Sequence, residues 1–431
     1  MKNTILIKGG HVIDPANNID RLADIIISRG YIAGVGEAGG MKADRVIDAG
    51  GLVVIPGLID MHVHLREPGF EEDETIATGQ QAAAAGGFTA VACMPNTEPA
   101  LDTQASLEFV RLRATERPNV RVYPIAAVTR GRQSRELTDF ERLSAAGAVG
   151  FSDDGSPVLT TELVQKAMQR LKPLEKPLIA HCEVLNLSKG GVINDGPTAK
   201  RFGLTGIPAE SEWQMVRRDV DLVRITGCHL HIAHISTARA LDIVESAKSN
   251  GLPVSAEVTP HHLTLCDEDI KEPDPNYKMN PPLRSARDVA ALREGIIAGI
   301  IDVIADDHAP HRPGRKNVDI RDAPFGVTGL ETSLAVVATE MVHKGLMNWS
   351  DLVERMSIAP AKILGVVGGS LSTGAPADIT LVDTEREWVI NSNRFLSKSR
   401  NTCFDGKKVR GKAVLTMVGG EVVYDEIECR S

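Results

Sequence analysis

Two histidines and an arginine alternate in the stretch "IDMHVHLREPG", residues 59–69, as His62, His64 and Arg66. Side chains two residues apart on a strand share one face, so these three are expected to point the same way. Two imidazoles at this spacing can bind one metal ion, and an arginine beside them can pair with a carboxylate through two hydrogen bonds. Alone, the histidine pair is a weak signal, because two unrelated histidines with ordinary hydrogen bonds would look the same.

Further ionisable or polar side chains follow other apolar runs and strengthen the prediction of a metal site. A catalytic zinc needs His or carboxylate ligands plus an open position, and it lowers the pKa of bound water to about 7. A neighbouring carboxylate can then take and return the proton. The aspartates of "ADDHAPH", residues 305–311, are placed for that duty. The residues at these strand ends are Asn96, Asp153, Asp154, His181, His229, His231, His234, His261, His262, Asp306, Asp307, His308 and His311.

The elements that must position these side chains alternate between apolar, strand-like runs and helical segments. Thr, Ser and Asp begin several of the helical segments, and Gly ends several of them, as helix caps do. Eight such repeats predict a parallel (β/α)8 barrel, with an open doubly wound sheet as the alternative. The barrel is favoured because it gathers all strand C-termini on one face. The eight runs are 57–65, 86–96, 120–129, 146–155, 176–183, 228–237, 252–262 and 300–311.

Both ends of the chain have a different residue pattern from the middle. They alternate Val, Ile, Thr and Tyr between Gly-rich turns, which is the pattern of short strands and hairpins. The predicted fold is therefore α/β. A TIM-like (β/α)8 barrel spans residues 57–365, and residues 1–56 and 366–431 together form a small β-sandwich domain.

The bulk composition excludes several classes of protein. The chain has 431 residues, 42% of them hydrophobic, and a formal net charge of −9, which argues against a nucleic-acid binder. No apolar run approaches the ~20 residues that span a bilayer, and the N-terminus has no signal-peptide pattern, so we expect a cytoplasmic protein without a membrane partner. The scattered cysteines are expected to be reduced thiols. They are Cys93, Cys182, Cys228, Cys266, Cys403 and Cys429.

This set of motifs resembles the amidohydrolase superfamily of metal-dependent hydrolases, and within it the bacterial class I dihydroorotase family. The resemblance extends from residue 60 to residue 326, and the terminal β segments fit the split β domain of the superfamily. The matching stretches are "DMHVHLREPG", "GGFTAVACMPNT", "FSDDG", "AHCE", "AHIST", "AEVTPHHL", "YKMNPPLR" and "ADDHAPH", followed by "APFG".

The resemblance implies a zinc centre with a defined set of ligands. His62, His64 and Asp307 would hold one ion, His181 and His234 would hold a second, and Asp154 would bridge them. Two zinc ions are therefore expected rather than one. A single ion stays an alternative, because relatives often bridge with a carbamylated lysine and residues 147–157, "GAVGFSDDGSP", contain no Lys. From the residues alone, Asp153 and Asp306 are equally open as ligands.

The resemblance also implies the reaction, which is the interconversion of N-carbamoyl-L-aspartate and (S)-dihydroorotate in pyrimidine biosynthesis. Asp307 would be the catalytic acid and base, and Arg66 would pair with the ring carboxylate of this small-molecule substrate. The remaining substrate-binding residues would be His64, Asn96, Asn280, His311, Phe325 and Gly326.

Other readings of the same sequence stay open. An allantoinase or hydantoinase is one alternative, and a catalytically inactive scaffold for a transcarbamoylase is another. The resemblance permits a homodimer and an association with aspartate transcarbamoylase. The polar segment "RPGRKNVDIRDAPFG", residues 312–326, is expected to act as a mobile lid. The histidines without a metal role are interpreted as structural or as supports for the ligands; they are His229, His231, His261 and His262.

Overall fold

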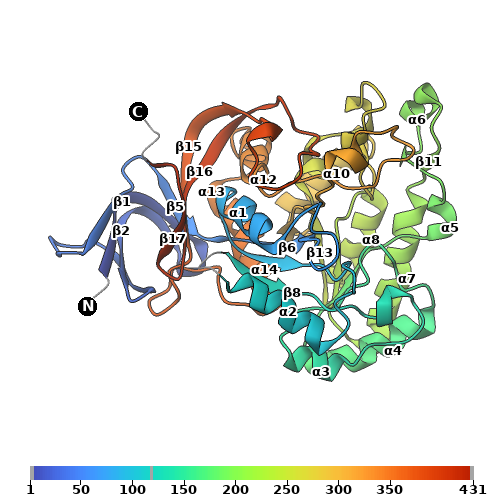
Figure 1. Cartoon of the computed structure of the whole chain (residues 1–431), viewed down its shortest axis with the longest axis horizontal. Helices are drawn as coiled ribbons and strands as arrows, with labels where there is room; N and C mark the ends of the chain where they lie inside the picture. Colours follow the sequence, from blue (N-terminus) through green and yellow to red (C-terminus); the bar gives the residue numbers. More distant parts are fainter. Residues whose placement is uncertain (1–3, 117–119, 428–431) are drawn as a thin grey trace.

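The computed structural model describes residues 4–116 and 120–427 and shows an α/β chain with two parts (Figure 1). A sheet built from both chain ends lies on one side, and a body of parallel strands and helices lies on the other. The five described cysteines are free thiols, four of them buried, and Cys429 lies outside the described residues.

The terminal sheet combines strands from the first 56 residues with strands from residues 379–425. Its order is β17-β16-β15-β5-β1-β2-β3, with β4 beside β1. The two chain ends meet where β5 pairs antiparallel with β15, so the blue and red strands of Figure 1 adjoin. The strands are β1 (Thr4–Asp14), β2 (Ile19–Ser28), β3 (Tyr31–Gly36), β4 (Arg45–Asp48), β5 (Val53–Pro56), β15 (Ile379–Val389), β16 (Lys408–Val418) and β17 (Glu421–Asp425).

Parallel strands form the centre of the α/β body in two groups. One sheet has the order β6-β7-β8 and the other β14-β13-β12-β9. Nearly all their residues are buried, which suits parallel strands covered on both faces. Isolated parallel bridges link the two sheets, through Phe151 at one edge and through Val63 and His308 at the other. The strands are β6 (Leu58–Val63), β7 (Phe88–Cys93), β8 (Arg121–Pro124), β9 (Leu178–Ala180), β12 (Leu230–Ile232), β13 (Val254–Val258) and β14 (Val303–Ile304).

The segment 146–155, predicted as the fourth strand, lies between β8 and β9 and pairs with both over a short length. Only Phe151 makes bridges there, one to Ala126 and one to Leu178. Gly147 and Gly155 have φ of 104° and 71°, which breaks the extended conformation on both sides. Backbone hydrogen bonds extend this pairing: the N–H groups of Val149 and Ser152 donate to the carbonyl oxygens of Pro124 and Ala126, at 3.1 and 2.9 Å, and the N–H of Ile179 donates to the carbonyl oxygen of Phe151 at 2.8 Å. The segment therefore pairs with β8 and β9 over a short length between its two glycines.

Helices cover the parallel strands, and the predicted cap residues begin most of the long ones. Hydroxyls of Thr75, Thr160, Thr237 and Ser285 accept a backbone N–H of the first turn. The helices are α1 (Ile76–Ala85), α2 (Gln104–Ala114), α3 (Phe140–Ala145), α4 (Thr161–Leu171), α5 (Leu185–Ser188), α6 (Pro197–Phe202), α7 (Glu210–Thr226), α8 (Ala238–Ser249), α9 (Pro260–Thr264), α10 (Ala286–Ile297), α11 (Pro313–Lys316), α12 (Ser333–Val337), α13 (Trp349–Val353) and α14 (Ala359–Leu364); β10 (Ile193–Asn194) pairs with β11 (Gly206–Ile207).

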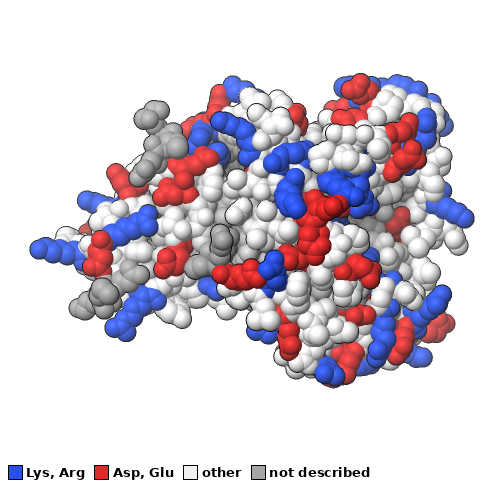
Figure 2. All heavy atoms as spheres, viewed as in Figure 1, with Lys and Arg blue, Asp and Glu red and all other residues white. Residues whose placement is uncertain are grey.

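The surface in view carries both signs of charge. Figure 2 shows basic and acidic side chains interspersed over this face, without one broad basic patch of the kind a nucleic-acid binder would present. Among the described residues, no helix combines the length and the apolar character needed to cross a bilayer.

Candidate metal centre and active site

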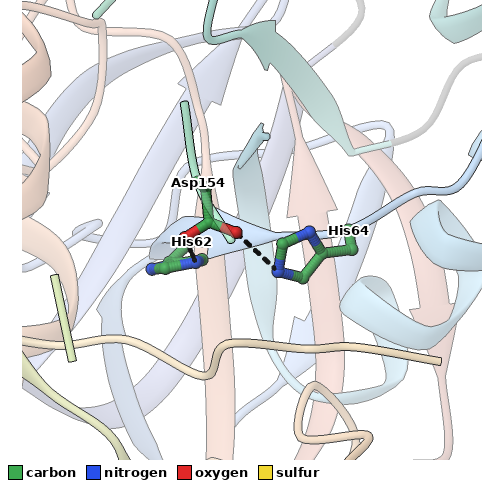
Figure 3. Close-up of side chains that lie close together, drawn as sticks. All are labelled: His62, His64 and Asp154. Carbon is green, nitrogen blue, oxygen red and sulfur yellow. Dashed lines mark ion pairs between the residues drawn. The ribbon is translucent and has the colours of Figure 1, made fainter. Parts of the chain in front are cut away.

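The two histidines at the end of β6 lie on either side of one aspartate. Both imidazoles are buried, and Asp154 reaches them from the glycine-rich segment after Phe151. His62 Nε2 is 3.4 Å from Asp154 Oδ1, and His64 Nε2 is 3.6 Å from Asp154 Oδ2. Figure 3 shows the carboxylate between the two rings. The period of two along the strand thus places both imidazoles on one face, as the sequence predicts.

A second group of donors shares the same aspartate. His181 follows β9 and His234 follows β12, and both are buried. His181 Nδ1 lies 3.6 Å and His234 Nε2 lies 3.8 Å from Asp154 Oδ1. The donor atoms within each group of three lie within 4.8 Å of one another, which is close enough to hold a metal ion.

Three of the imidazoles are oriented by an oxygen acceptor on the side away from the cluster. An acceptor at that position can take the ring proton of the outer nitrogen, so that the inner nitrogen is free to bind a metal ion. This is the arrangement that metal-binding histidines adopt. The pairs are His62 Nδ1 with Glu257 Oε1 at 2.5 Å, His64 Nδ1 with Asn96 Oδ1 at 2.8 Å, and His181 Nε2 with Glu183 Oε2 at 3.1 Å.

The inner atoms of the cluster fit a cation. His62 Nε2 and Asp154 Oδ1 are buried and have no hydrogen-bond partner among the described residues. Burial alone would raise the pKa of Asp154, but the neighbouring imidazoles, His62 foremost, hold it well below its usual range. A cation bound between the imidazoles would take the place of their positive charge and would give these two buried atoms a partner.

Asp307 joins this cluster from the segment after β14. Its Oδ1 is 2.9 Å from His64 Nε2 and 3.5 Å from His62 Nε2. Its backbone is left-handed, with φ of 48°, a conformation that is rare for a residue other than glycine. Burial would raise the pKa of Asp307, but the hydrogen bond with His64 outweighs it and holds the pKa at about 2. The carboxylate is therefore ionised at neutral pH.

The structure separates the two members of each aspartate pair. The carboxylate of Asp153 accepts hydrogen bonds from the backbone of Val128 and Thr129, at 2.8 and 3.1 Å, and so points away from the imidazoles. Asp306 packs against the buried carboxyl group of Asp60, and burial raises the pKa of both groups. Only the second aspartate of each pair reaches the histidine cluster.

Arg66 lies beside the cluster and is held by the segment that follows Asp307. Its Nε donates to the carbonyl oxygen of Pro310 at 3.1 Å, and its Nη2 lies 3.4 Å from His311 Nε2. Burial lowers the pKa of Arg66 to about 10, so the guanidinium keeps its charge at neutral pH. Burial and the charge of Arg66 lower the pKa of His311 to about 2. The neutral imidazole donates its Nε2–H to the carbonyl oxygen of Phe325 at 2.7 Å.

The other predicted substrate residues are divided between two places. Asn96 contacts His64, while Asn280 Nδ2 donates to Glu183 Oε2 at 2.9 Å, beside His181. The N–H of Gly326 donates to the carbonyl oxygen of Lys278 at 2.9 Å, so this N–H is occupied within the chain. The structure brings Arg66, His311 and Phe325 together and leaves the two asparagines on the histidine side.

The segment 312–326, predicted as a mobile lid, is tied down by one buried lysine. The ammonium group of Lys316 donates to the carbonyl oxygens of Lys278, Pro324 and Gly326, at 3.1, 2.9 and 2.7 Å. These three acceptors satisfy all three N–H donors of the ammonium group. The segment therefore has an internal anchor close to Phe325 and Gly326.

Three contributors to the site escape the sequence analysis. Glu257 contacts His62 and also His231 Nε2, at 3.1 Å, and Glu183 contacts His181. Their signals are modest: Glu257 is the one charged residue of the apolar strand "VSAEV", and Glu183 lies two residues after His181. Arg132 hydrogen-bonds the backbone oxygen of Asp154 from 22 residues away, and no local pattern reveals that contact.

The arrangement as a whole suits hydrolysis of an amide that carries a carboxylate. One side offers donors for a divalent cation and an ionised aspartate that can exchange a proton. The other side offers the charged guanidinium of Arg66, which pairs well with a carboxylate. A reacting amide between the two sides would have its carboxylate fixed while its carbonyl group faces the cluster.

Comparisons with known proteins agree with this chemistry. The model of the Dihydro-orotase-like family matches residues 51–240. The chain is 46% identical over 424 residues to the dihydroorotase of Syntrophus aciditrophicus, covering 98% of this chain and 99% of that protein. It is 48% identical over 422 residues to the dihydroorotase of Pelotomaculum thermopropionicum, covering 98% and 99%. It also resembles the solved L-hydantoinase (dihydropyrimidinase) of Arthrobacter aurescens, with a TM-score of 0.89 and 28% identity over 99% of this chain and 96% of that one.

Proposed function

The chain belongs to the dihydroorotase family, and from this premise we propose that it interconverts N-carbamoyl-L-aspartate and (S)-dihydroorotate, the third step of pyrimidine nucleotide synthesis. It is a hydrolase that acts on cyclic amides. The observation that carries this conclusion is the charged Arg66 beside His64 and Asp307, because the ring carboxylate distinguishes dihydroorotate from plain hydantoins.

We propose that the cluster binds two zinc ions. His62, His64 and Asp307 would hold one, His181 and His234 would hold the other, and Asp154 would contact both. The two donor groups that share Asp154 support a pair of ions over a single ion. When bound, zinc polarises the amide carbonyl and lowers the pKa of a water molecule.

The residues of the chain would divide the remaining work. Asp307 takes the proton of the attacking water and gives it to the ring nitrogen as that bond breaks. In ring closure the same carboxylate acts as the base toward the ureido nitrogen. Arg66 fixes the ring carboxylate, with His311 beside it, and Asn96 and Asn280 contact the polar groups of the ring near the histidines. Glu257 and Glu183 keep the ligand imidazoles in the required orientation.

We further propose the finer features of the fold and the assembly. Residues 57–365 would close into a (β/α)8 barrel, which the parallel bridges through Phe151 and through Val63 and His308 support. Residues 1–56 and 366–431 would form the β-sandwich domain. Family membership supports a cytoplasmic homodimer and an association with aspartate transcarbamoylase, which sedimentation of the chain with and without that enzyme tests.

A substrate comparison coupled to metal analysis tests the function. The full chain, loaded with zinc, should turn over dihydroorotate with a kcat/KM at least 100-fold above the values for hydantoin and allantoin. Only dihydroorotate carries the ring carboxylate with which Arg66 would pair. About two zinc ions per chain are expected from plasma mass spectrometry. Equal turnover of hydantoin or allantoin would contradict the assignment, and a zinc-loaded chain inactive on all three would support the scaffold alternative.

A further inference from the structure

A strap from the C-terminal segment, residues 395–402, crosses the loops that carry the substrate side of the site. Its hydroxyls reach the loop after Arg66: Ser399 Oγ donates to the carbonyl oxygen of Asp73 at 2.7 Å, and Ser397 Oγ donates to Glu74. Ser399 and Asn401 are buried. The strap thus connects the region of the terminal sheet with the mouth of the α/β body.

The side-chain amide of Asn401 bridges two loops of the candidate site. Its Oδ1 accepts the backbone N–H of His311 at 3.0 Å. Its Nδ2 donates to the carbonyl oxygens of Ala309 and Gly326, at 3.0 and 3.1 Å. The opposite orientation of the amide would set its NH2 group against an N–H and its oxygen against two carbonyl oxygens, so the contacts fix the orientation.

These contacts lie on either side of the group that holds Arg66. Pro310, whose carbonyl oxygen accepts from Arg66 Nε, lies between Ala309 and His311, and Asn401 holds the backbone of both. Gly326 follows Phe325, whose carbonyl oxygen accepts from His311. Arg66 therefore donates to the central residue of the segment 309–311, and Asn401, more than 300 positions after Arg66 in the chain, holds this segment in place.

We propose that Asn401 is a positioning residue for recognition of the substrate carboxylate. It acts through Pro310 on Arg66 and through the backbone on His311, and it touches neither the substrate nor the histidine cluster. This inference rests on the proposed function, because it assigns the partner of Arg66 to the ring carboxylate. Asn401→Ala leaves Arg66 in the chain but frees the loop that directs it, so the loss falls on substrate affinity.

A double-mutant cycle with Arg66 tests the inference. Asn401→Ala should raise the KM for dihydroorotate about tenfold, with kcat changed by less than about threefold and zinc content unchanged. In an Arg66→Ala background the same substitution should have a clearly smaller effect on KM, because only the route through His311 is left. Asn393→Ala, at an exposed asparagine just before the strap, is the matched control and should leave KM unchanged.

The outcomes separate the alternatives. An unchanged KM in Asn401→Ala, a full additional loss in the Arg66→Ala background, or a loss of zinc would each overturn the inference in favour of a general structural role. If Asn401→Ala does not fold, Asn401→Ser is measured in the same cycle. Calorimetric binding of N-carbamoyl-L-aspartate in an Asp307→Asn background repeats the cycle without turnover. An inactive wild-type chain would then count against the proposed function while the positioning role is still measured.

Discussion

The histidine cluster and the Arg66 side of the site lie next to each other but are held by different means. Each imidazole of the cluster is attached at or near the end of a parallel strand, and buried side-chain acceptors such as Glu257 and Glu183 orient three of the rings. Arg66 and His311 instead lie on loops, and backbone carbonyl groups and one distant asparagine hold them.

The difference suggests that the rigid histidine cluster performs the chemistry, whereas the loops around Arg66 select the substrate. Metal ligands need geometry within a fraction of an ångström, which strands and their buried partners provide. Substrate selection can depend on loops, because loops change in sequence without disturbing the strands beneath them. The same cluster could therefore serve a different cyclic amide after changes confined to the loops around Arg66.

The substitution with the largest expected effect is Asp307→Asn, because Asp307 contacts the cluster and directly precedes the segment 308–311, which holds Arg66. The amide cannot accept a proton, so kcat should fall by at least about 1,000-fold. Steady-state assays with dihydroorotate measure kcat, and metal analysis measures the zinc content of the variant. Activity near that of the wild type would mean that Asp306 or another group is the base.

Removal of the metal has the second-largest expected effect and acts on the histidine cluster. A ligand present at about 1,000 times its Kd stabilises the fold by roughly 4 kcal/mol, so chelation should lower the melting temperature and abolish turnover. Zinc, but not magnesium, should restore both, because imidazole ligands favour zinc. A melting temperature that is the same with and without chelator would argue that the cluster holds no ion.

Arg66→Ala should damage only the loop side. Loss of a charge-assisted pair costs about 1.5–3 kcal/mol, so the KM for dihydroorotate should rise about 10- to 150-fold. Zinc content and melting temperature should stay near those of the wild type, since no metal ligand changes. The assignment of the carboxylate partner fails if KM is unaltered.

Glu257→Gln should damage only the cluster side, with the smallest effect of the four. Loss of a charged acceptor behind a metal ligand weakens metal binding by about 10- to 100-fold, because the basicity of His62 falls. Competition with a zinc chelator measures this affinity, and the KM at saturating zinc should hardly change. Glu245→Gln, on the exposed face of α8, is the matched control. A rise in KM without a change in zinc affinity would mean that Glu257 supports the substrate side of the site and not the histidine cluster.

Much of the fold and of the candidate site follows from local pattern. The shared face of His62 and His64 needs only the period of a strand, and the caps at Thr75, Thr237 and Ser285 need only a hydroxyl before a helical run. The segment 146–155 follows the strand pattern over a shorter length, because Gly147 and Gly155, both with positive φ, confine its pairing with β8 and β9 to residues 149–152. Arg66 lies beyond the end of β6 with φ of 61°, so strand alternation does not direct it.

The sequence by itself determined which residue types can do the chemistry and that strand ends carry them, since the periods of helix and strand are local properties. It left Asp153 and Asp154 equivalent, as well as Asp306 and Asp307, because neighbours in a chain differ only in the direction that tertiary packing gives them. Only the tertiary structure turned one member of each pair toward the histidines. It alone brought Glu257 behind His62 and Asn401 behind Arg66, because contacts across hundreds of residues depend on how the whole chain folds.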